Sequence, residues 1–523
     1  MAQKSLVESQ AVHRGATAPV AGRGARRRPD GRWAEVVPGL VSWLVVLAPI
    51  WLTVLNAQAG IMFVTLVTLY FVVRVSRYGL QSLLNRRRVL GAVQRDWLAD
   101  LQQLKERQWR HYRVTLLIRA FREGNREMLR ETLESIYASN WPRDGKLLHN
   151  VEVVFATEED DPITPPLVDE FSREFADRLV VRQIKHPETP GHLPGPSSAM
   201  NYAGWALYNE AVQSGFPPHY WLVADFDCDT QFHPQYLPSL VYYYATDRKR
   251  HRHVYQPVVL FTKGYWEAPL HSRMSAMGTS VLTLGWIRGP EIAFTGAAAS
   301  LALLRSVDFW PTNSHSQDSG IELRLRLRYG ADFKVIGLPV PLSVYPVMIV
   351  GRWQGRVEWA RAYWRSFCTL FRQGARWREG PLDEFVESVA LREPGLATYK
   401  LWNGLERDTL TLLPAVGPIA VNVVLWLLGR QNPGIHLAFV WPILSVVLSI
   451  GSVIGVSAIG QMLLTREFIH RKQGLRRGLL ELLLFWITWS VYVPILSACA
   501  GLKTSTAYLL GQRPRGHYVP TPK

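Results

Sequence analysis

The chain has 523 residues, of which 48% are hydrophobic and 19% charged, and its formal net charge is +17. This length exceeds one compact core, and the composition is typical of a membrane protein that carries a large soluble domain. Because the positive charges cluster beside apolar runs, we expect an anionic membrane face and no nucleic acid as partner. The three cysteines, Cys228, Cys368 and Cys499, have neither disulfide nor metal-site spacing, which is consistent with a reducing compartment.

The segment before the middle domain is predicted to cross the membrane twice. Residues 1–37 are rich in Ala, Gly and Arg and are expected to form a disordered cytosolic tail. Two apolar runs within residues 38–78 predict a transmembrane helical hairpin. Residues 79–112 have a basic helical pattern, and the positive-inside rule places them in the cytosol together with the domain that follows. We therefore expect a multi-pass protein of the cell membrane with a cytoplasmic middle domain.

The middle domain, residues 113–345, alternates between strand and helix signals. Strands are predicted at 114–118, 151–155, 179–181 and 220–224, and helices at 126–139, 165–175, 199–214 and 321–329. Such alternation builds an α/β domain with a mostly parallel sheet and helices on both faces. Ligands of such sheets bind beyond the carboxyl ends of the strands, so acidic residues at strand ends are candidate site residues.

One predicted strand, Tyr220 to Ala224, leads into three aspartates at alternate positions, Asp225, Asp227 and Asp229. Strand side chains alternate between faces, so the three carboxylates point one way if the strand continues. Crowded carboxylates repel one another and are tolerated when a hard cation lies among them, usually Mg²⁺ or Mn²⁺. Taken alone, the stretch is explained equally well as an acidic loop at a strand end.

The C-terminal part returns to the membrane. Residues 346–405 are rich in Trp and Arg, which is typical of amphipathic helices in the membrane interface, although a soluble helical subdomain has the same signature. Three further apolar spans are predicted within residues 406–502. The odd total of spans places the tail, residues 503–523, outside the cell, whereas its basic residues place it inside. The two indications conflict.

Seven stretches resemble the membrane-bound family 2 glycosyltransferases, which include cellulose, chitin and hyaluronan synthases. They occur in the expected order over residues 113–367: VTLLIRAFRE (114–123), LRETLESIYASNWP (129–142), VEVVFATEEDD (151–161), GPSSAMN (195–201), DCDTQFHP (227–234), GPEIAFTGAAASLALL (289–304) and SQD (316–318). The resemblance implies a GT-A type α/β fold inserted between transmembrane helices, about two before it and about three after it.

The resemblance also implies roles for particular residues. Asp227 and Asp229 match the family's Asp-x-Asp pair, in which the first faces the nucleotide and the second holds the metal, so both are candidate metal ligands. Asp318 matches the general base that takes the acceptor proton, a role that suits a carboxylate whose pKa is raised. Capping a helix is the alternative role for Asp318. Asp225 is an extra carboxylate that is expected to support the pair.

Further candidates for substrate binding lie in the same stretches. They are Arg119, Glu123, Glu158, Asp227, Thr295, Gly296 and Gln317, with Glu159 and Asp160 as alternatives to Glu158. Two residues depart from the family pattern. Pro196 stands in the place of a lysine, which removes one contact to the diphosphate, and Gln317 stands in the place of a glutamate beside the base.

The family's Gln-x-x-Arg-Trp motif, which lines the acceptor channel, has two candidate positions. Trp359 stands at the expected distance after the base, but both Gln and Arg of the motif are missing in this register, and Gln354 stands one place early. Gln373, Arg376 and Trp377 match the letters further along the chain. We favour the first register because the geometry depends on the position in the helix, and we expect Trp359 to stack on an acceptor sugar.

The resemblance implies an inverting glycosyltransferase that uses Mg²⁺ or Mn²⁺ and an aspartate base. It would move a sugar from a nucleotide-sugar donor, expected to be UDP-linked, to a polysaccharide or lipid-linked acceptor and form β-glycosidic bonds. The alternatives are a non-processive transferase that adds one sugar to a lipid, and a catalytically silent membrane receptor or scaffold on the same fold. The sugar, the acceptor and any accessory subunits stay open.

Overall fold

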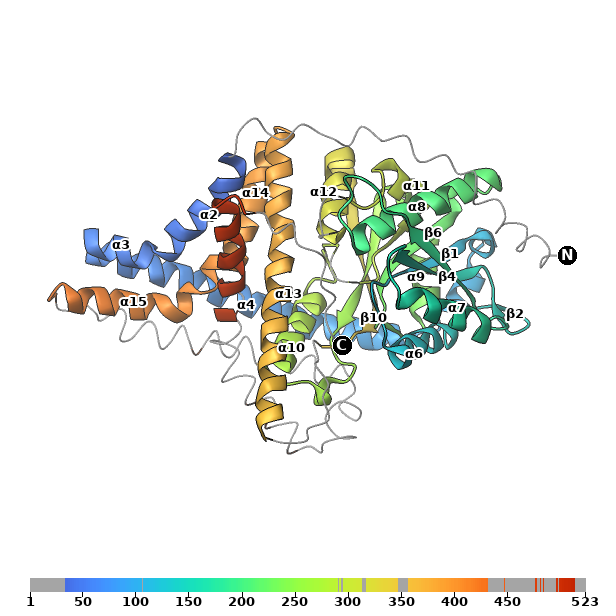
Figure 1. The fold of residues 1–523 in the computed structure, drawn as a ribbon, viewed down its shortest axis with the longest axis horizontal. Helices are drawn as coiled ribbons and strands as arrows, with labels where there is room; N and C mark the ends of the chain where they lie inside the picture. Colours follow the sequence, from blue (N-terminus) through green and yellow to red (C-terminus); the bar gives the residue numbers. More distant parts are fainter. Residues whose placement is uncertain are drawn as a thin grey trace.

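The computed structural model describes residues 33–105, 107–289, 291–292, 295–312, 317–346, 356–430 and 498–512, together with residues 446, 476, 480, 483, 495 and 496. A sheet-containing domain lies at one end of this part of the chain and a group of helices at the other (Figure 1). The long helix α13 (Arg356–Ala390) stands between them.

An eight-stranded sheet with the order β5-β4-β1-β6-β9-β8-β10-β7 forms the centre of the domain. β5, β4, β1 and β6 are parallel neighbours, and the short β9 runs antiparallel between β6 and β8. β10 is parallel to β8 and antiparallel to β7. The strands are β1 (Arg113–Arg119), β4 (Val151–Glu158), β5 (Val180–His186), β6 (Trp221–Asp227), β7 (Gln231–Phe232), β8 (His253–Leu260), β9 (Ala298–Ser300) and β10 (Lys334–Ser343), with β2 (Arg143–Asp144) and β3 (Leu147–Leu148) in a separate hairpin. The predicted α/β domain with a mostly parallel sheet is confirmed.

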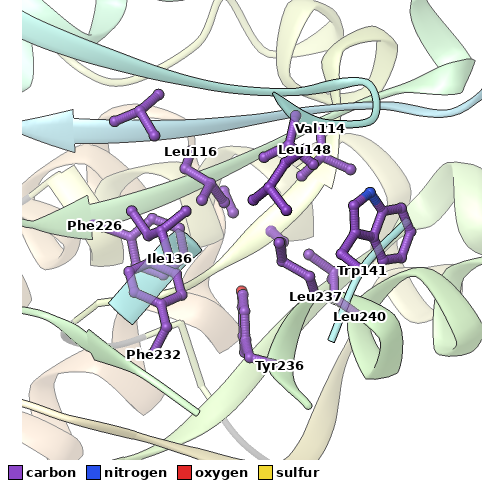
Figure 2. Packing of buried hydrophobic residues seen from close by; sticks show 14 of the residues in the cluster. Val114, Leu116, Ile136, Trp141, Leu148, Phe226, Phe232, Tyr236, Leu237 and Leu240 are labelled. Atoms are coloured by element: carbon purple, nitrogen blue, oxygen red, sulfur yellow. The ribbon is translucent and has the colours of Figure 1, made fainter. Parts of the chain in front are cut away.

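Helices cover both faces of the sheet, which is why the strands are near-continuous apolar runs. They are α5 (Trp97–Gln103), α6 (Arg126–Tyr137), α7 (Thr164–Glu174), α8 (Pro196–Gln213), α9 (Tyr236–Thr246), α10 (Leu270–Gly285), α11 (Leu301–Ser306) and α12 (Gln317–Tyr329). On one face, Val114 and Leu116 of β1 belong to the same buried cluster as Ile136 of α6 and Leu237 of α9 (Figure 2). On the other face, Leu117 clusters with residues of α8.

The helices before the domain differ from the predicted hairpin. α2 (Trp33–Val46) and α3 (Ala48–Leu55) meet at an angle of 57°, and α4 (Ala57–Gln94) then runs back as one helix of 38 residues. The expected boundary at residues 78/79 therefore falls inside α4. The second half of α4 is held against the domain, where Asn85 Nδ2 donates to the carbonyl of Leu284 in α10 at 2.9 Å.

The predicted number of transmembrane helices is not supported by the described residues. Within the described part of the chain, α4 is the one helix long and apolar enough to cross a membrane, and the bent pair α2–α3 qualifies as a second if it is one span. α15 (Leu413–Leu427) is apolar but shorter. The spans predicted at 436–464 and 478–501 lie mostly outside the described residues.

The Trp- and Arg-rich segment forms α13 and α14 (Pro394–Leu405), followed by a π-helical turn, Glu406–Leu410. Lys400 of α14 forms a buried ion pair with Glu384 of α13, and both side chains are more than nine-tenths buried. Arg74 of α4 pairs with Glu406, with 2.6 Å between Nε and Oε1. The first ion pair joins α13 to α14, and the second joins the π-helical turn to α4.

Candidate active site

A cavity of 1020 Å³ lies at the carboxyl ends of β1 and β6 and extends along α4, α10, α12, α13 and α14. On the side of the sheet it is lined by the predicted residues Arg119, Glu123, Asp227, Asp229, Thr295, Gln317 and Asp318. On the side of the helices it is lined by aromatic and charged residues that include Tyr70, Arg74, Arg376, Trp377, Tyr399, Lys400 and Trp402. The site at the strand ends is therefore continuous with the helical part of the molecule.

The three aspartates after the predicted strand occupy different environments. Asp225 and Asp227 belong to β6, opposite Leu117 and Arg119 of β1, whereas Asp229 lies beyond the end of the strand. The strand ends at Asp227, so the condition under which all three carboxylates would point one way is not met. Asp227 and Asp229 line the cavity.

Asp225 is almost completely buried, and its Oδ1 has no hydrogen-bond partner within the described part of the chain. Burial raises the pKa of Asp225 to about 8, with Arg119 opposing the rise and Asp318 and Asp227 adding to it. A raised pKa favours the neutral form of this carboxyl, which weakens its repulsion of Asp227.

Arg119, the last residue of β1, joins the predicted nucleotide-binding aspartate to the predicted base. Its Nε donates to Asp227 Oδ1 at 2.9 Å, and its Nη1 donates to Asp318 Oδ1 at 3.3 Å. The same Nη1 lies 3.8 Å from Asp225 Oδ2. Residues from β1, β6 and the first turn of α12 thus meet in one ion-pair network.

Thr295 and Gly296 form the turn that backs this network. The amide of Asp227 donates to Thr295 Oγ1 at 3.0 Å, and the Gly296 amide donates to the Asp225 carbonyl at 2.6 Å. Gly296 has a φ of +89°, and a Cβ there would lie 2.6 Å from side-chain atoms of Leu342 and Pro257. Only glycine meets both conditions. Thr295 lines the cavity, whereas Gly296 contributes through its backbone.

Asp229 is held by the backbone that follows β10. Its Oδ2 accepts the amide N–H of Tyr345 at 3.2 Å. The Tyr345 hydroxyl donates to Glu131 Oε2 at 2.9 Å, and Lys263 Nζ lies 3.0 Å from the same oxygen. No local sequence pattern predicts a role for Tyr345 or Lys263, because their partners are distant in sequence.

Two carboxylates are available for a divalent metal. Among the described residues, no group of three or more His, Cys, Asp or Glu side chains is placed to hold an ion. Mg²⁺ commonly binds through one or two carboxylates together with substrate phosphates, rather than inside an all-protein cage. Asp227 and Asp229, both on the cavity wall, fit an ion of this kind that is shared with a diphosphate.

The acidic residues at the end of β4 do not line the cavity. Glu158 accepts the Gly195 amide at 2.8 Å and lies 2.6 Å from His186 Nδ1, so it fixes the start of α8. Its alternatives, Glu159 and Asp160, are exposed. Within the described part of the chain, the contacts of Glu158 are thus with β5 and the start of α8.

Glu123 lies on the cavity wall as predicted. Its Oε1 accepts the amide of Asn125 at 2.9 Å, and its Oε2 lies 3.5 Å from the Cys228 sulfur. The start of α7 is held by Asp161, whose Oδ1 accepts the amides of Ile163 and Thr164, and the amide of Glu123 donates to Thr164 Oγ1 at 2.9 Å. Glu123 is thus held in place by the backbone of its own loop.

Of the two candidate acceptor motifs, only the second can be located. Gln354 lies outside the described residues, and the side chain of Trp359 is not described. Gln373, Arg376 and Trp377 line the cavity from α13. Tyr399 and Trp402 of α14 add aromatic surface to the same wall. The Trp-rich composition was the one sequence signal for these two residues.

No family model and no curated protein matches this chain. Among solved structures, it is similar to a mannosyltransferase from Pyrobaculum calidifontis in complex with GDP-mannose and Mn²⁺. The sequence identity is 16% and the TM-score 0.38, over 77% of this chain and 100% of that one. At this level of similarity, the function has to be argued from the chemistry of the site.

Proposed function

We propose that the chain is a membrane-bound, inverting glycosyltransferase that transfers a sugar from a nucleotide-sugar, expected to be UDP-linked, to a polysaccharide or lipid-linked acceptor. One observation carries the proposal. Arg119, Asp227, Asp229 and Asp318 meet at one edge of a mostly parallel sheet, on the wall of a cavity that continues between aromatic and charged helices. The resemblance to family 2 glycosyltransferases in the sequence assigns these same aspartates.

The donor would bind at the strand ends, with its diphosphate beside Asp227 and Asp229. These two carboxylates would hold Mg²⁺ or Mn²⁺, which when bound neutralises charge on the leaving diphosphate. Thr295 accepts the amide of Asp227 and so fixes the backbone of the motif. Tyr345 fixes the carboxylate of Asp229 through its amide.

Asp318 would act as the general base. It lies in the first turn of α12, and its side chain is 24% exposed on the cavity wall, so an acceptor hydroxyl can reach it. The hydroxyl oxygen attacks the anomeric carbon as the bond from that carbon to the diphosphate breaks, and the hydroxyl proton passes to Asp318. Attack from the face opposite the diphosphate converts an α-linked donor into a β-linked product.

The acceptor would lie in the helical part of the cavity. Trp377, Tyr399 and Trp402 present aromatic surface there, and neighbouring charged side chains supply hydrogen bonds. Aromatic faces beside polar groups suit sugar rings, which have apolar faces and polar rims. In this proposal, Gln373, Arg376 and Trp377 bind the acceptor. The size of the product distinguishes processive from single transfer.

The membrane would hold the helices before and after the domain. Large apolar side chains are exposed on α2, α3, α4 and α15, among them Leu44, Ile50, Trp51, Leu55, Met62, Leu66, Val73, Ile419, Val423 and Trp426. Soluble monomers rarely expose contiguous apolar patches of this kind, so we place them in lipid. The arginines that follow in α4, Arg77 and Arg86 to Arg88, support a cytoplasmic catalytic domain through the positive-inside rule.

The test uses the full chain in lipid nanodiscs and measures nucleoside diphosphate release from a panel of nucleotide-sugars, with and without Mn²⁺, followed by sizing of the product. We expect metal-dependent release with at least one donor and a fall of about 10²- to 10⁴-fold in Asp318→Asn, the range for loss of a general base. Asp332→Asn is the matched control, because Asp332 is paired on the surface with Lys249 and Arg252. Equal rates in Asp318→Asn and wild type would refute the role of Asp318 as the base, and no release from any donor would favour a silent receptor.

A further inference from the structure

The guanidinium of Arg119 lies behind the carboxylates that it contacts. The side chain of Arg119 is 4% exposed, whereas those of Asp227 and Asp318 are 39% and 24% exposed. All three residues line the cavity, and Arg119 has by far the least exposed side chain of the three. A side chain in this position has little surface with which to bind a substrate.

Two different nitrogens of one rigid group make the two contacts. Nε donates to Asp227 Oδ1 at 2.9 Å and Nη1 to Asp318 Oδ1 at 3.3 Å. Because the guanidinium is planar and its donors are fixed relative to one another, these bonds set the distance and angle between the two carboxylates. Without the intervening cation, the carboxylates would repel each other.

We propose that Arg119 is a positioning residue, which holds the base Asp318 in register with Asp227 and so aligns the acceptor side of the site with the donor side. The inference rests on the proposed function and deepens it. Asp227 is part of β6, which pairs with β1 through Arg119 itself, so its position is set by the sheet. Asp318 begins α12, which belongs to a different layer of the domain, and Arg119 ties that helix start to the sheet.

Lysine cannot replace this arginine without loss. Its ammonium is a point charge on a flexible stem and does not reproduce the fork that spans two carboxylates. We therefore expect Arg119→Lys to keep the charge but release the start of α12. Misplacement of a catalytic group by about 1 Å costs up to about 10²-fold in rate.

The chain contains a matched control. Arg182 of β5 also bridges two carboxylates, with Nε 3.0 Å from Glu152 Oε2 and Nη2 2.8 Å from Glu210 Oε2. It does not belong to the lining of the cavity described above. Arg182→Lys thus makes the same substitution in a similar ion-pair bridge away from the site.

The experiment compares wild type, Arg119→Lys and Arg182→Lys as full chains in nanodiscs. Amide hydrogen exchange over residues 317–329 is measured without substrates, and kcat and the donor KM are measured with the donor found above. For Arg119→Lys we expect faster exchange at the start of α12, a fall in kcat of about 10- to 100-fold, and a donor KM within about threefold of wild type. Arg182→Lys should leave the exchange at α12 and kcat unchanged.

A double variant separates action through the base from other roles. In the Asp318→Asn background, Arg119→Lys should lower the residual rate by less than about threefold, since a residue that acts through Asp318 has nothing further to position. A full additive loss in the double variant would overturn the proposal. So would a rise in donor KM at unchanged kcat, which would make Arg119 a donor contact.

The exchange measurement keeps this inference separate from the proposed function. If wild type turns over a donor but exchange at α12 is the same in Arg119→Lys, the positioning role is refuted and the glycosyltransferase stands. If wild type turns over no donor, the proposed function is refuted, and the exchange comparison still decides whether Arg119 holds Asp318.

Discussion

Gly296 offers a direct test of how the site is built, because two separate costs oppose any side chain there. Its φ of +89° is a conformation that other residues rarely adopt, and a Cβ would lie 2.6 Å from Leu342 Cδ1 and from Pro257 Cγ. Backbone strain of this kind costs about 1–3 kcal/mol and overpacking about 1–3 kcal/mol more. Gly296→Ala should therefore destabilise the domain by about 2–6 kcal/mol, the sum of these two ranges.

Gly145 separates the two costs. It has a φ of +66°, but a Cβ there would meet nothing within 4 Å. Gly145→Ala should thus show the strain alone, and the difference between the two variants reports the clash. For a domain of roughly 200 residues, that difference corresponds to an unfolding midpoint lower by about 2–12 °C.

The measurement is thermal unfolding of both variants in nanodiscs, together with nucleoside diphosphate release. Because the Gly296 amide donates to the carbonyl of Asp225, movement of this turn should also shift β6 and lower the rate of transfer. Gly145→Ala should keep the wild-type rate. Equal midpoints for the two alanine variants would refute the packing argument, and a wild-type rate in Gly296→Ala would refute the link between the turn and the site.

Two further predictions concern buried charges. Glu384→Gln leaves Lys400 without its buried partner and should lower the free energy of unfolding by about 3–5 kcal/mol. Adding Lys400→Met should recover much of this loss. A double variant that is less stable than Glu384→Gln would contradict the prediction. Burial lowers the pKa of His271 from 6.5 to about 4, so the unfolded chain binds the proton first as the pH falls. The free energy of unfolding, measured against pH, should therefore drop by about 3 kcal/mol between about pH 6.5 and 4. This drop should be smaller in His271→Phe. Equal pH profiles for the variant and wild type would contradict the prediction.

Much of the domain could be predicted from local patterns. The apolar runs at 114–118 and 151–155 became β1 and β4, and the amphipathic stretch 126–139 became α6, because burial on one or both sides leaves a clear periodicity. The end of β6 was less predictable. Two aspartates continue that strand, since their backbones are paired with β1 even though their side chains disfavour strands.

In the helical region, local patterns did not predict how far a helix extends. A basic segment after an apolar run predicted a boundary at 78/79, but α4 continues through it. Helix propensity permits this, and Asn85 secures the second half of α4 to the end of α10 through two carbonyl groups. That contact joins residues about two hundred positions apart, and nothing in either segment alone indicates the other.

The sequence by itself determined four of the strands, four of the helices and the acidic residues at the strand ends, because these depend on neighbours along the chain. It also pointed to Asp227, Asp229 and Asp318 through their resemblance to known motifs. Only the tertiary structure decided which charges share an environment. Sheet order and register bring Arg119 beside Asp227, and the placement of α12 brings Asp318 to the same guanidinium. Burial also raises the pKa of Asp225, and this effect depends on everything packed around the side chain.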